Sequence, residues 1–314
     1  MKFDAPLSFV PLYMDRVWGG RRLETVLGRN LPLQRPIGES WELVDREDAQ
    51  SVVDGGEFAG MTLHELWMNH REDVFGKGLP DSKRFPLLAK ILDAQDTLSV
   101  QVHPPAHLAA KLGGEPKTEM WYLLDAEPGS ELFAGFTRTA TREKFEHALA
   151  SGLTADLLHR IPVEAGDSIF IPSGRCHAIG AGCLIVEMQQ NSDTTYRVFD
   201  WNRVGLDGKP RQMHVEQSLE CMDFDDLEPG LIHAVGEGLV ECEFFKVERW
   251  DLQAVRVDPD ETGCIFTVLS GDVLCGGRKF AAGQFFLLPA TSAQRAIQPL
   301  VAGTKLLKTT IPIH

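Results

Sequence analysis

Polar side chains alternate along residues 97–103, a segment whose apolar pattern predicts a β-strand. Ser99, Gln101 and His103 fall on one face of this strand, because successive side chains of a strand point to opposite sides. Polar groups on an inward face are costly unless they have partners. The imidazole of His103 and the amide of Gln101 offer nitrogen and oxygen donors for a metal ion. This strand is therefore the first candidate element of a metal site.

Two further segments add donors of the same kind. In residues 117–121 the period of two aligns Lys117 with Glu119, and His177 lies on a turn that follows another predicted strand. Two histidines, one glutamate and one glutamine can bind a divalent ion. Nitrogen and oxygen donors without a thiolate suit zinc, iron, manganese or cobalt. From residue types alone, hydrogen-bonded loop histidines and a glutamate in a salt bridge remain the alternative.

Extended segments bounded by turn residues must position these groups. We predict strands over 85–93, 97–103, 118–124, 167–171, 183–189, 243–250, 264–270, 283–289 and 305–311. Helices are fewer. Thr62 and Glu65 form a capping box, Thr141 can cap a helix over 142–151 that ends before Gly152, and 214–221 is a third short helix.

A possible internal repeat connects two of the predicted strands. Gly166 is followed six residues later by Pro172, and Gly283 is followed at the same spacing by Pro289. The position that corresponds to His177 in the second copy is Gln294. The repeat favours two related β-barrels, of which only the first carries the imidazole. The acidic segment 223–230 is the candidate linker between them.

Composition limits the class of protein. The chain has 314 residues, which suggests about two domains, and a formal net charge of −14. Such a chain is not expected to bind nucleic acid or an anionic membrane. No apolar run is long enough for a membrane span, and the first residues lack a secretory apolar region. The six cysteines include no CxxC pair, so we expect reduced thiols and a cytoplasmic protein.

Several segments together resemble a known family. The run from Gly166 to His177 is similar to the second metal motif of the cupin superfamily, although Ala181 stands where that motif usually ends in asparagine. The first motif has Gln101 in place of its usual first histidine, and its glutamate comes 16 residues after His103. Both departures are typical of type I phosphomannose isomerases, short bacterial class. Similar segments are Val17-Trp-Gly-Gly20, Ile37-Gly-Glu-Ser-Trp-Glu42, Phe85-Pro-Leu-Leu-Ala-Lys-Ile-Leu-Asp93, 98–104, Lys117-Thr-Glu-Met-Trp-Tyr122 and Asp193-Thr-Thr-Tyr-Arg-Val-Phe-Asp200.

The resemblance implies a mainly β fold of two cupin-like jelly-roll barrels with a few short α-helices. We expect a catalytic metal-binding domain over 1–229 and a second domain over 230–314 that lacks the metal site. The implied enzyme is an aldose–ketose isomerase that interconverts mannose 6-phosphate and fructose 6-phosphate through a cis-enediol, usually with zinc. Its only implied partner is a small sugar phosphate, and the oligomeric state is not predicted.

The resemblance also implies roles for individual residues. The metal-ligand positions of the family fall on Gln101, His103, Glu119 and His177. The arginine treated as catalytic falls on Arg197, although Asp200 nearby makes a structural ion pair equally compatible with the sequence. We assign Lys117 a catalytic or phosphate-contacting role. Candidate substrate contacts are Ser99, Lys90, Glu187 and Trp18; of these, Lys90 interrupts an apolar run and would need a buried partner.

Two other functions use a similar donor set. A non-haem iron oxygenase binds its metal through two histidines and a carboxylate, but Gln101 and the segment 193–200 count against it. A non-catalytic sugar-binding or regulatory cupin is the other alternative. The presence of both His103 and Glu119 counts against that alternative. We therefore predict the isomerase.

Overall fold

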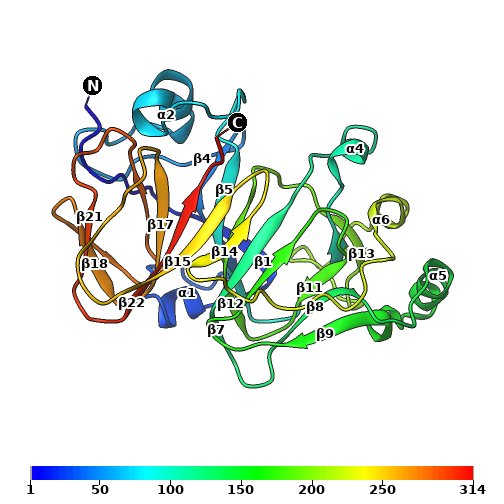
Figure 1. The fold of residues 1–314 in the computed structure, drawn as a ribbon. Coiled ribbons are helices and arrows are strands. Elements are labelled where there is room, and N and C mark those ends of the chain that lie inside the picture. Colours follow the sequence, from blue (N-terminus) through cyan, green and yellow to red (C-terminus); the bar gives the residue numbers. More distant parts are fainter. Residues whose placement is uncertain (1, 314) are drawn as a thin grey trace. The chain divides into compact units, whose positions relative to one another are not determined.

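The structure is a computed structural model that describes residues 2–313. The chain separates into two compact units: one contains residues up to 12, 41–89 and from 233 onward, and the other contains 13–40 and 90–232. β-Strands dominate both units (Figure 1), so the expected mainly β fold is confirmed. The change of unit after residue 232 lies close to the linker expected at 223–230. Residues 41–89, however, belong with the C-terminal segment, whereas the division from sequence places them in 1–229.

Short helices connect the strands, and their ends follow the capping signals. The helices are α1 (Arg22–Thr25), α2 (Leu63–Asn69), α3 (Arg71–Val74), α4 (Ala106–Ala109), α5 (Arg142–Ser151), the 3₁₀ helix η1 (Thr154–Leu157) and α6 (Val215–Cys221). The capping box forms at α2, where the Glu65 amide donates to Thr62 Oγ1 and the Thr62 amide donates to the Glu65 carboxylate. Gly152 ends α5 at a positive φ of 73°, a conformation that glycine adopts without strain.

Two antiparallel sheets form the unit of residues 13–40 and 90–232. The first has the order β1 (Leu12–Gly20), β2 (Ile37–Leu43), β5 (Leu87–Ala94), β12 (Cys183–Gln190), β7 (Glu119–Ala126) and β10 (Ser168–Ile171). To this unit β2 contributes residues 37–40, and β5 contributes 90–94. The second sheet has the order β13 (Tyr196–Phe199), β6 (Val100–Val102), β11 (His177–Ile179), β8 (Glu131–Phe136) and β9 (Leu158–Pro162).

The two sheets of this unit pack face to face over a shared core. One buried cluster contains Trp121 and Ile185 from the first sheet together with Leu132 and Ile179 from the second. Alternating side chains of each sheet fill the space between the layers, as in other two-layer β folds. The polar groups singled out on the strands over 97–103 and 117–121 are therefore enclosed in the interior of this unit.

The other unit has its own sheets. One has the order β14 (Gly238–Glu241), β15 (Lys246–Leu252), β22 (Thr304–Thr310), β17 (Cys264–Ser270) and β20 (Phe285–Leu288). A second has the order β16 (Arg256–Val257), β21 (Ala296–Pro299), β18 (Asp272–Cys275) and β19 (Arg278–Ala281), and β3 (Asp45–Arg46) pairs with β4 (Ala49–Gln50). Their core includes Trp250, Phe266 and Phe286. The orange and red strands β17, β18, β21 and β22 in Figure 1 belong to this unit.

The strand registers allow positions in the two copies of the predicted internal repeat to be matched. In one unit Ile171 of β10 pairs with Glu119 of β7, and in the other Leu288 of β20 pairs with Cys264 of β17. Leu288 and Ile171 are equivalent positions of the repeat, because 117 residues separate them, as they separate Gly283 from Gly166. Cys264 therefore occupies the position of Glu119. By the neighbouring registers, Lys308 on β22 occupies the position of Glu187 on β12.

Cys264 and Lys308 belong to a buried ion-pair cluster. The Lys308 ammonium lies 2.5 Å from Asp258 Oδ1 and 2.5 Å from Asp260 Oδ2. Arg295 pairs with the other oxygen of Asp258. Two cations thus neutralise these two carboxylates. In this unit, the position that corresponds to Glu119 of the candidate metal site therefore lies in a cluster of ion pairs.

All six cysteines are free thiols, as expected from their spacing. Among residues 2–313, no helix has the length and apolar character needed to cross a membrane.

Candidate active site

Strand pairing brings the predicted metal ligands together from three segments. His177 on β11 pairs with Gln101 on β6, and His103 follows β6 on the same face as Gln101. Glu119 is the first residue of β7 in the facing sheet. The sheet-on-sheet packing therefore places a carboxylate opposite two imidazoles, although up to 76 residues separate the ligands in the chain.

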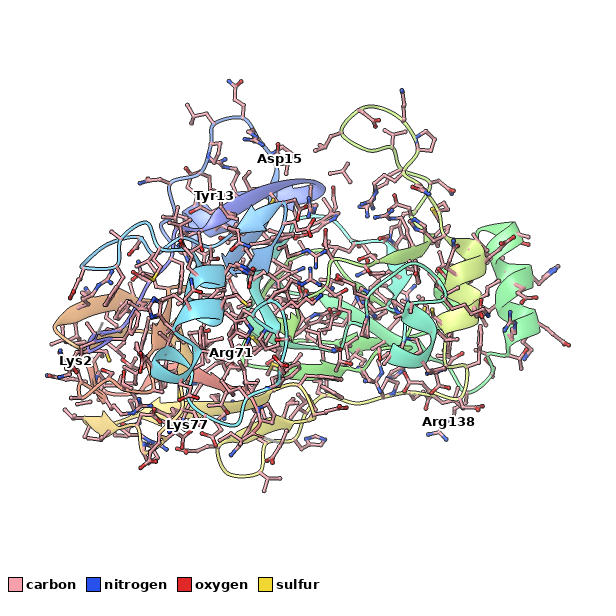
Figure 2. All side chains as sticks on the ribbon, turned by 90° about the horizontal axis from the view of Figure 1, so that it is seen from above. Lys2, Tyr13, Asp15, Arg71, Lys77 and Arg138 are labelled. Atoms are coloured by element: carbon pink, nitrogen blue, oxygen red, sulfur yellow. The ribbon has the colours of Figure 1, made fainter. Side chains whose placement is uncertain are left out.

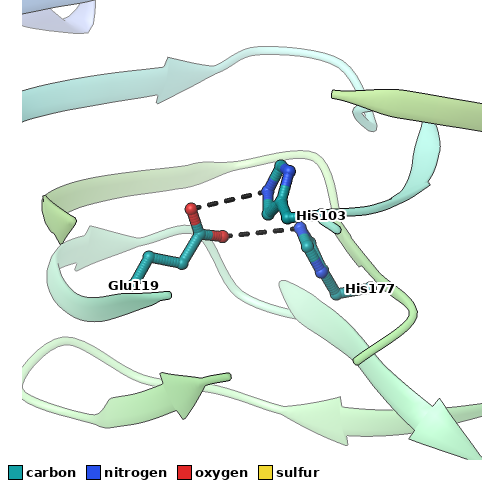
Figure 3. A group of neighbouring side chains, drawn as sticks. All are labelled: His103, Glu119 and His177. Carbon is teal, nitrogen blue, oxygen red and sulfur yellow. Dashed lines mark ion pairs between the residues drawn. The ribbon is translucent and has the colours of Figure 1, made fainter. Parts of the chain in front are cut away.

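The donor atoms converge at contact distances. Glu119 Oε2 lies 3.6 Å from His103 Nε2, and Glu119 Oε1 lies 3.4 Å from His177 Nε2 (Figure 3). The amide nitrogen of Gln101 is 3.3 Å from His177 Nε2. The side chains of the three charged or titratable residues are at most 1% exposed. The four residues thus surround one small buried volume.

Main-chain carbonyls orient both imidazoles. His103 Nδ1 lies 2.8 Å from the carbonyl oxygen of Thr194, and His177 Nδ1 lies 2.9 Å from that of Arg175. A carbonyl oxygen only accepts hydrogen bonds, so each Nδ1 carries the proton of the neutral ring. Each Nε2 then presents its lone pair toward Glu119. This is the usual arrangement of metal-binding histidines.

The electrostatic environment keeps the donors in their metal-binding protonation states. Burial lowers the pKa of His103 well below its usual value, and the Lys117 charge adds to this effect. Burial and the neighbouring His103 lower the pKa of His177 to about 3. Burial alone would raise the pKa of Glu119, but Lys117 and His177 lower it to about 2. At neutral pH the site therefore offers two neutral imidazoles and one carboxylate.

An unsatisfied carboxylate oxygen also indicates that a divalent cation binds here. Glu119 Oε1 is buried and accepts no hydrogen bond from any residue within 2–313. A buried carboxylate oxygen without a donor is unfavourable unless a cation binds it. Gln101, His103, Glu119 and His177 would supply such an ion with the nitrogen and oxygen ligands that zinc and similar metals accept.

A row of alternating charges leads away from this centre across the first sheet. Each member forms an ion pair with the next, at distances between 2.7 and 3.8 Å. The row consists of Arg16 on β1, Glu39 on β2, Lys90 on β5, Glu187 on β12, Lys117, and Glu119 on β7. The Arg16 side chain is 31% exposed, and every other side chain of the row is at most 10% exposed, with Glu119 fully buried.

The predicted lysines occupy the inner part of this row. The Lys117 ammonium is 2.8 Å from Glu119 Oε2, 3.2 Å from His103 Nε2 and 3.7 Å from Glu187 Oε1. Lys90 lies 3.1 Å from Glu187 Oε2 and 3.8 Å from Glu39 Oε2. The sequence predicted that a buried Lys90 would need a partner, and two carboxylates fill this role.

Arg197 lines the same space, and no carboxylate of residues 2–313 forms an ion pair with it. Its Nε donates to Ser99 Oγ at 3.2 Å, and its Nη1 donates to the carbonyl oxygen of Gln212. Asp200 instead pairs with Arg203 and Arg211. The alternative in which Arg197 forms a structural ion pair with Asp200 is therefore wrong, because Arg203 and Arg211 occupy this carboxylate. Burial and the Arg211 charge lower the pKa of Arg197 to about 10, so it stays cationic at neutral pH.

A cavity of about 590 Å³ opens beside the metal-ligand cluster, a volume suited to a small ligand. Sequence reasoning had singled out seven of the residues that line it: Trp18, Lys90, Ser99, Gln101, Lys117, Glu187 and Arg197. Trp18 also packs in the core cluster, with 4% of its surface exposed, so it forms part of the cavity wall.

Other lining residues were missed from sequence. They include Arg16, Glu39, Asp193, Arg211 and His214. The sequence did contain a signal for Arg16: it lies two residues before Trp18 on β1, so both side chains lie on the same face of the strand. Glu39 lies within a segment already noted for its resemblance. Arg211 and His214 lie in the irregular segment before α6, where no periodicity indicates direction.

Comparisons with known proteins agree with this geometry. Residues 7–142 match the family model of the phosphomannose isomerase type I catalytic domain. Mannose-6-phosphate isomerase ManA of Bacillus subtilis is 38% identical over 301 residues, covering 90% of this chain and 93% of that protein. Mannose-6-phosphate isomerase of Streptococcus mutans is 38% identical over 298 residues, covering 91% and 93%. The crystal structure of the mannose 6-phosphate isomerase from Bacillus subtilis superimposes with a TM-score of 0.87 at 30% identity, covering 98% and 100%.

Proposed function

Because the chain belongs to the type I phosphomannose isomerase family, we propose that it interconverts mannose 6-phosphate and fructose 6-phosphate with one bound zinc ion. The observation that carries the zinc site is that the donor atoms of His103, Glu119 and His177 all lie within 4.8 Å of one another. Gln101 completes the set of four ligands. Two histidines and one glutamate are a typical protein ligand set of a catalytic zinc site.

The reaction moves a proton between C2 and C1 of the open-chain sugar and exchanges the carbonyl and hydroxyl groups on these carbons. A metal ion held by Gln101, His103, Glu119 and His177 would supply a Lewis acid for the sugar's carbonyl group at this end of the cavity. The guanidinium of Arg197 is held by Ser99 beside Gln101, so it adds a permanent positive charge at the reacting end. Lys117 and Glu187, both nearly fully buried, provide a donor and an acceptor for the sugar hydroxyl groups next to that end.

The proposal is tested by assaying mannose 6-phosphate isomerisation before and after chelation, with the metal content measured in parallel. We expect chelation to abolish activity and zinc to restore it in proportion to the metal bound. Manganese or cobalt that restores more activity than zinc would overturn the choice of metal. No turnover by a protein shown to contain one metal ion per chain would overturn the isomerase.

Cytoplasmic location is part of the same proposal. Six free cysteines, five of them buried, suit a reducing compartment. Cell fractionation with an antibody against the chain would test it, and recovery outside the cytoplasmic fraction would contradict it.

A further inference from the structure

The sugar phosphate carries its phosphate on C6, at the opposite end from the reacting carbons C1 and C2. The reacting end must lie at the buried metal ligands, so the phosphate must point toward the more exposed part of the cavity. A phosphate dianion needs guanidinium or ammonium donors that are not already saturated by carboxylates. The cations lining the cavity can be compared on that criterion: Arg16, Lys90, Lys117, Arg197 and Arg211.

Three of these cations are committed to carboxylates. Lys90 lies between Glu39 and Glu187, and both side chains are at most 10% exposed. Lys117 lies between Glu119 and Glu187 in the same way. The guanidinium of Arg211 engages both oxygens of Asp200. Moving Lys90 or Lys117 to a phosphate would take a cation from two buried carboxylates at once, and moving Arg211 would break a two-point contact with Asp200.

Arg197 pairs with no carboxylate of residues 2–313, but it lies at the end of the cavity that holds the metal ligands. It pairs directly with Gln101 in the register of β13 and β6, so its side chain lies beside a metal ligand. That position suits the charge that develops on C1 and C2 rather than a phosphate on C6.

Arg16 meets both conditions. Its Nε donates to Glu39 at 2.7 Å and its Nη1 donates to the carbonyl oxygen of Asp15, which fixes the plane of the guanidinium. Its Nη2 donates no hydrogen bond to any residue within 2–313. Glu39 also pairs with Lys90, so its carboxylate keeps a second cation when Arg16 directs a donor at an anion.

The position of Arg16 also suits the far end of the substrate. Arg16 is on β1, and the sheet order places three strands between β1 and β7, which carries Glu119. Neighbouring strands are spaced by about 4.8 Å. The Arg16 side chain is 31% exposed, the largest value in the charge row.

We propose that Arg16 binds the phosphate group of the substrate and thereby selects phosphorylated sugars, with Glu39 as the residue that orients its guanidinium. This inference rests on the proposed function, because it takes a hexose 6-phosphate as the substrate. The row of ion pairs then joins the two ends of the binding site: Arg16 at the phosphate and Glu119 at the metal.

The test compares the R16M and R16K variants with wild type on mannose 6-phosphate and on unphosphorylated mannose. One lost charge-assisted contact corresponds to about ten- to a hundredfold in affinity. We expect R16M to raise KM for mannose 6-phosphate by that factor while kcat changes less than threefold. The inhibition constant of inorganic phosphate should rise in parallel, whereas turnover of mannose should be unchanged. R16K should recover part of the loss. The control is R35M, because Arg35 also contacts the β1 residue Asp15 (labelled in Figure 2) but does not line the cavity.

Two outcomes would overturn the proposal. One is an unchanged KM for mannose 6-phosphate in R16M. The other is an equal loss on both sugars, which would show that Arg16 only supports Glu39 and Lys90. Failure of the isomerase itself is distinguishable, because wild type would then not turn over mannose 6-phosphate. In that case calorimetric titration of wild type and R16M with inorganic phosphate decides whether Arg16 binds the anion: weaker binding by R16M supports the proposal, and equal binding overturns it.

Discussion

His103 Nδ1 lies 2.8 Å from the carbonyl oxygen of Thr194, a residue 91 positions further along the chain. This contact decides which nitrogen of the ring faces Glu119, because the carbonyl oxygen requires a proton on Nδ1. His177 has the same relationship with the carbonyl oxygen of Arg175. Main-chain atoms thus set the tautomer of both imidazoles, and with it the ability of the site to bind a cation.

Replacing Glu119 with glutamine should separate metal binding from folding. The amide keeps the shape of the side chain but loses the charge that binds the ion, so we expect E119Q to weaken zinc binding at least a hundredfold and to abolish activity. Competition with a chromophoric chelator measures the affinity. The matched control is E127Q, just beyond the other end of β7, where the side chain is exposed. Zinc binding by E119Q equal to that of wild type would exclude Glu119 as a ligand.

Asp226 should influence the metal without touching it. Both of its oxygens accept hydrogen bonds from the Arg175 guanidinium, and the Arg175 carbonyl orients His177. We expect D226A to weaken zinc binding about tenfold to a hundredfold, a typical effect of losing an outer partner of a metal ligand. The exposed neighbour Asp225 provides the control variant, D225A, which should bind zinc normally. Equal affinities in both variants would show that the Arg175–Asp226 pair does not position His177.

Arg197 and Ser99 should contribute unequally to turnover. R197K keeps the charge but loses the planar donors, so we expect kcat/KM to fall at least a hundredfold. S99A removes only the acceptor of Arg197 Nε and should cost about tenfold. A coupled assay that follows fructose 6-phosphate measures both variants. R138K, at an arginine whose side chain is 79% exposed, should match wild type. A larger loss in S99A than in R197K would contradict this order.

The metal-free protein should lose stability when the pH falls from 6.5 to 5. The pKa of His177 is about 3 in the folded state and about 6.5 in the unfolded chain. The unfolded chain therefore binds more protons in this interval, and the free energy of unfolding rises with pH. The expected slope is about 1 kcal/mol per pH unit for each buried histidine, and His103 acts in the same direction. Urea unfolding at several pH values measures it. H177Q should flatten the slope, and an unchanged slope would contradict the assignment.

Lys308 should be essential for the stability of its unit. Its side chain is 3% exposed and contacts two carboxylates, of which Asp258 is fully buried. We expect K308M to lower the free energy of unfolding by about 3 kcal/mol or more, because it leaves Asp258 short of a buried partner. K305M, on the same strand with a partly exposed side chain, should change it by about 0.5 kcal/mol at most. Addition of D258N to K308M should recover part of the loss, which would demonstrate the coupling.

Local features of the fold could be predicted from the sequence because they depend on near neighbours in the chain. The capping box at Thr62 and Glu65, the helix from Thr141 to Gly152 and the strand over 264–270 all formed where the local pattern indicated. The period of two correctly placed Gln101 with His103 and Lys117 with Glu119. The spacing from Gly166 and from Gly283 also predicted the repeat, and in both copies the segment between glycine and proline contains a strand at the edge of a sheet.

The pairing of distant residues was decided only by the tertiary structure. The interrupted apolar run showed that Lys90 needs a partner, but Glu39 and Glu187 lie 51 and 97 residues away, and no spacing rule links positions so far apart. The main-chain carbonyls that orient His103 and His177 carry no residue-type signal at all. Likewise, only the tertiary structure showed that Arg16 lines the cavity and pairs with Glu39. By itself, the sequence determined which donors exist and on which face of a strand they lie; the packing of two sheets decided which of them meet, because burial forces each charge to find an opposite charge across strands.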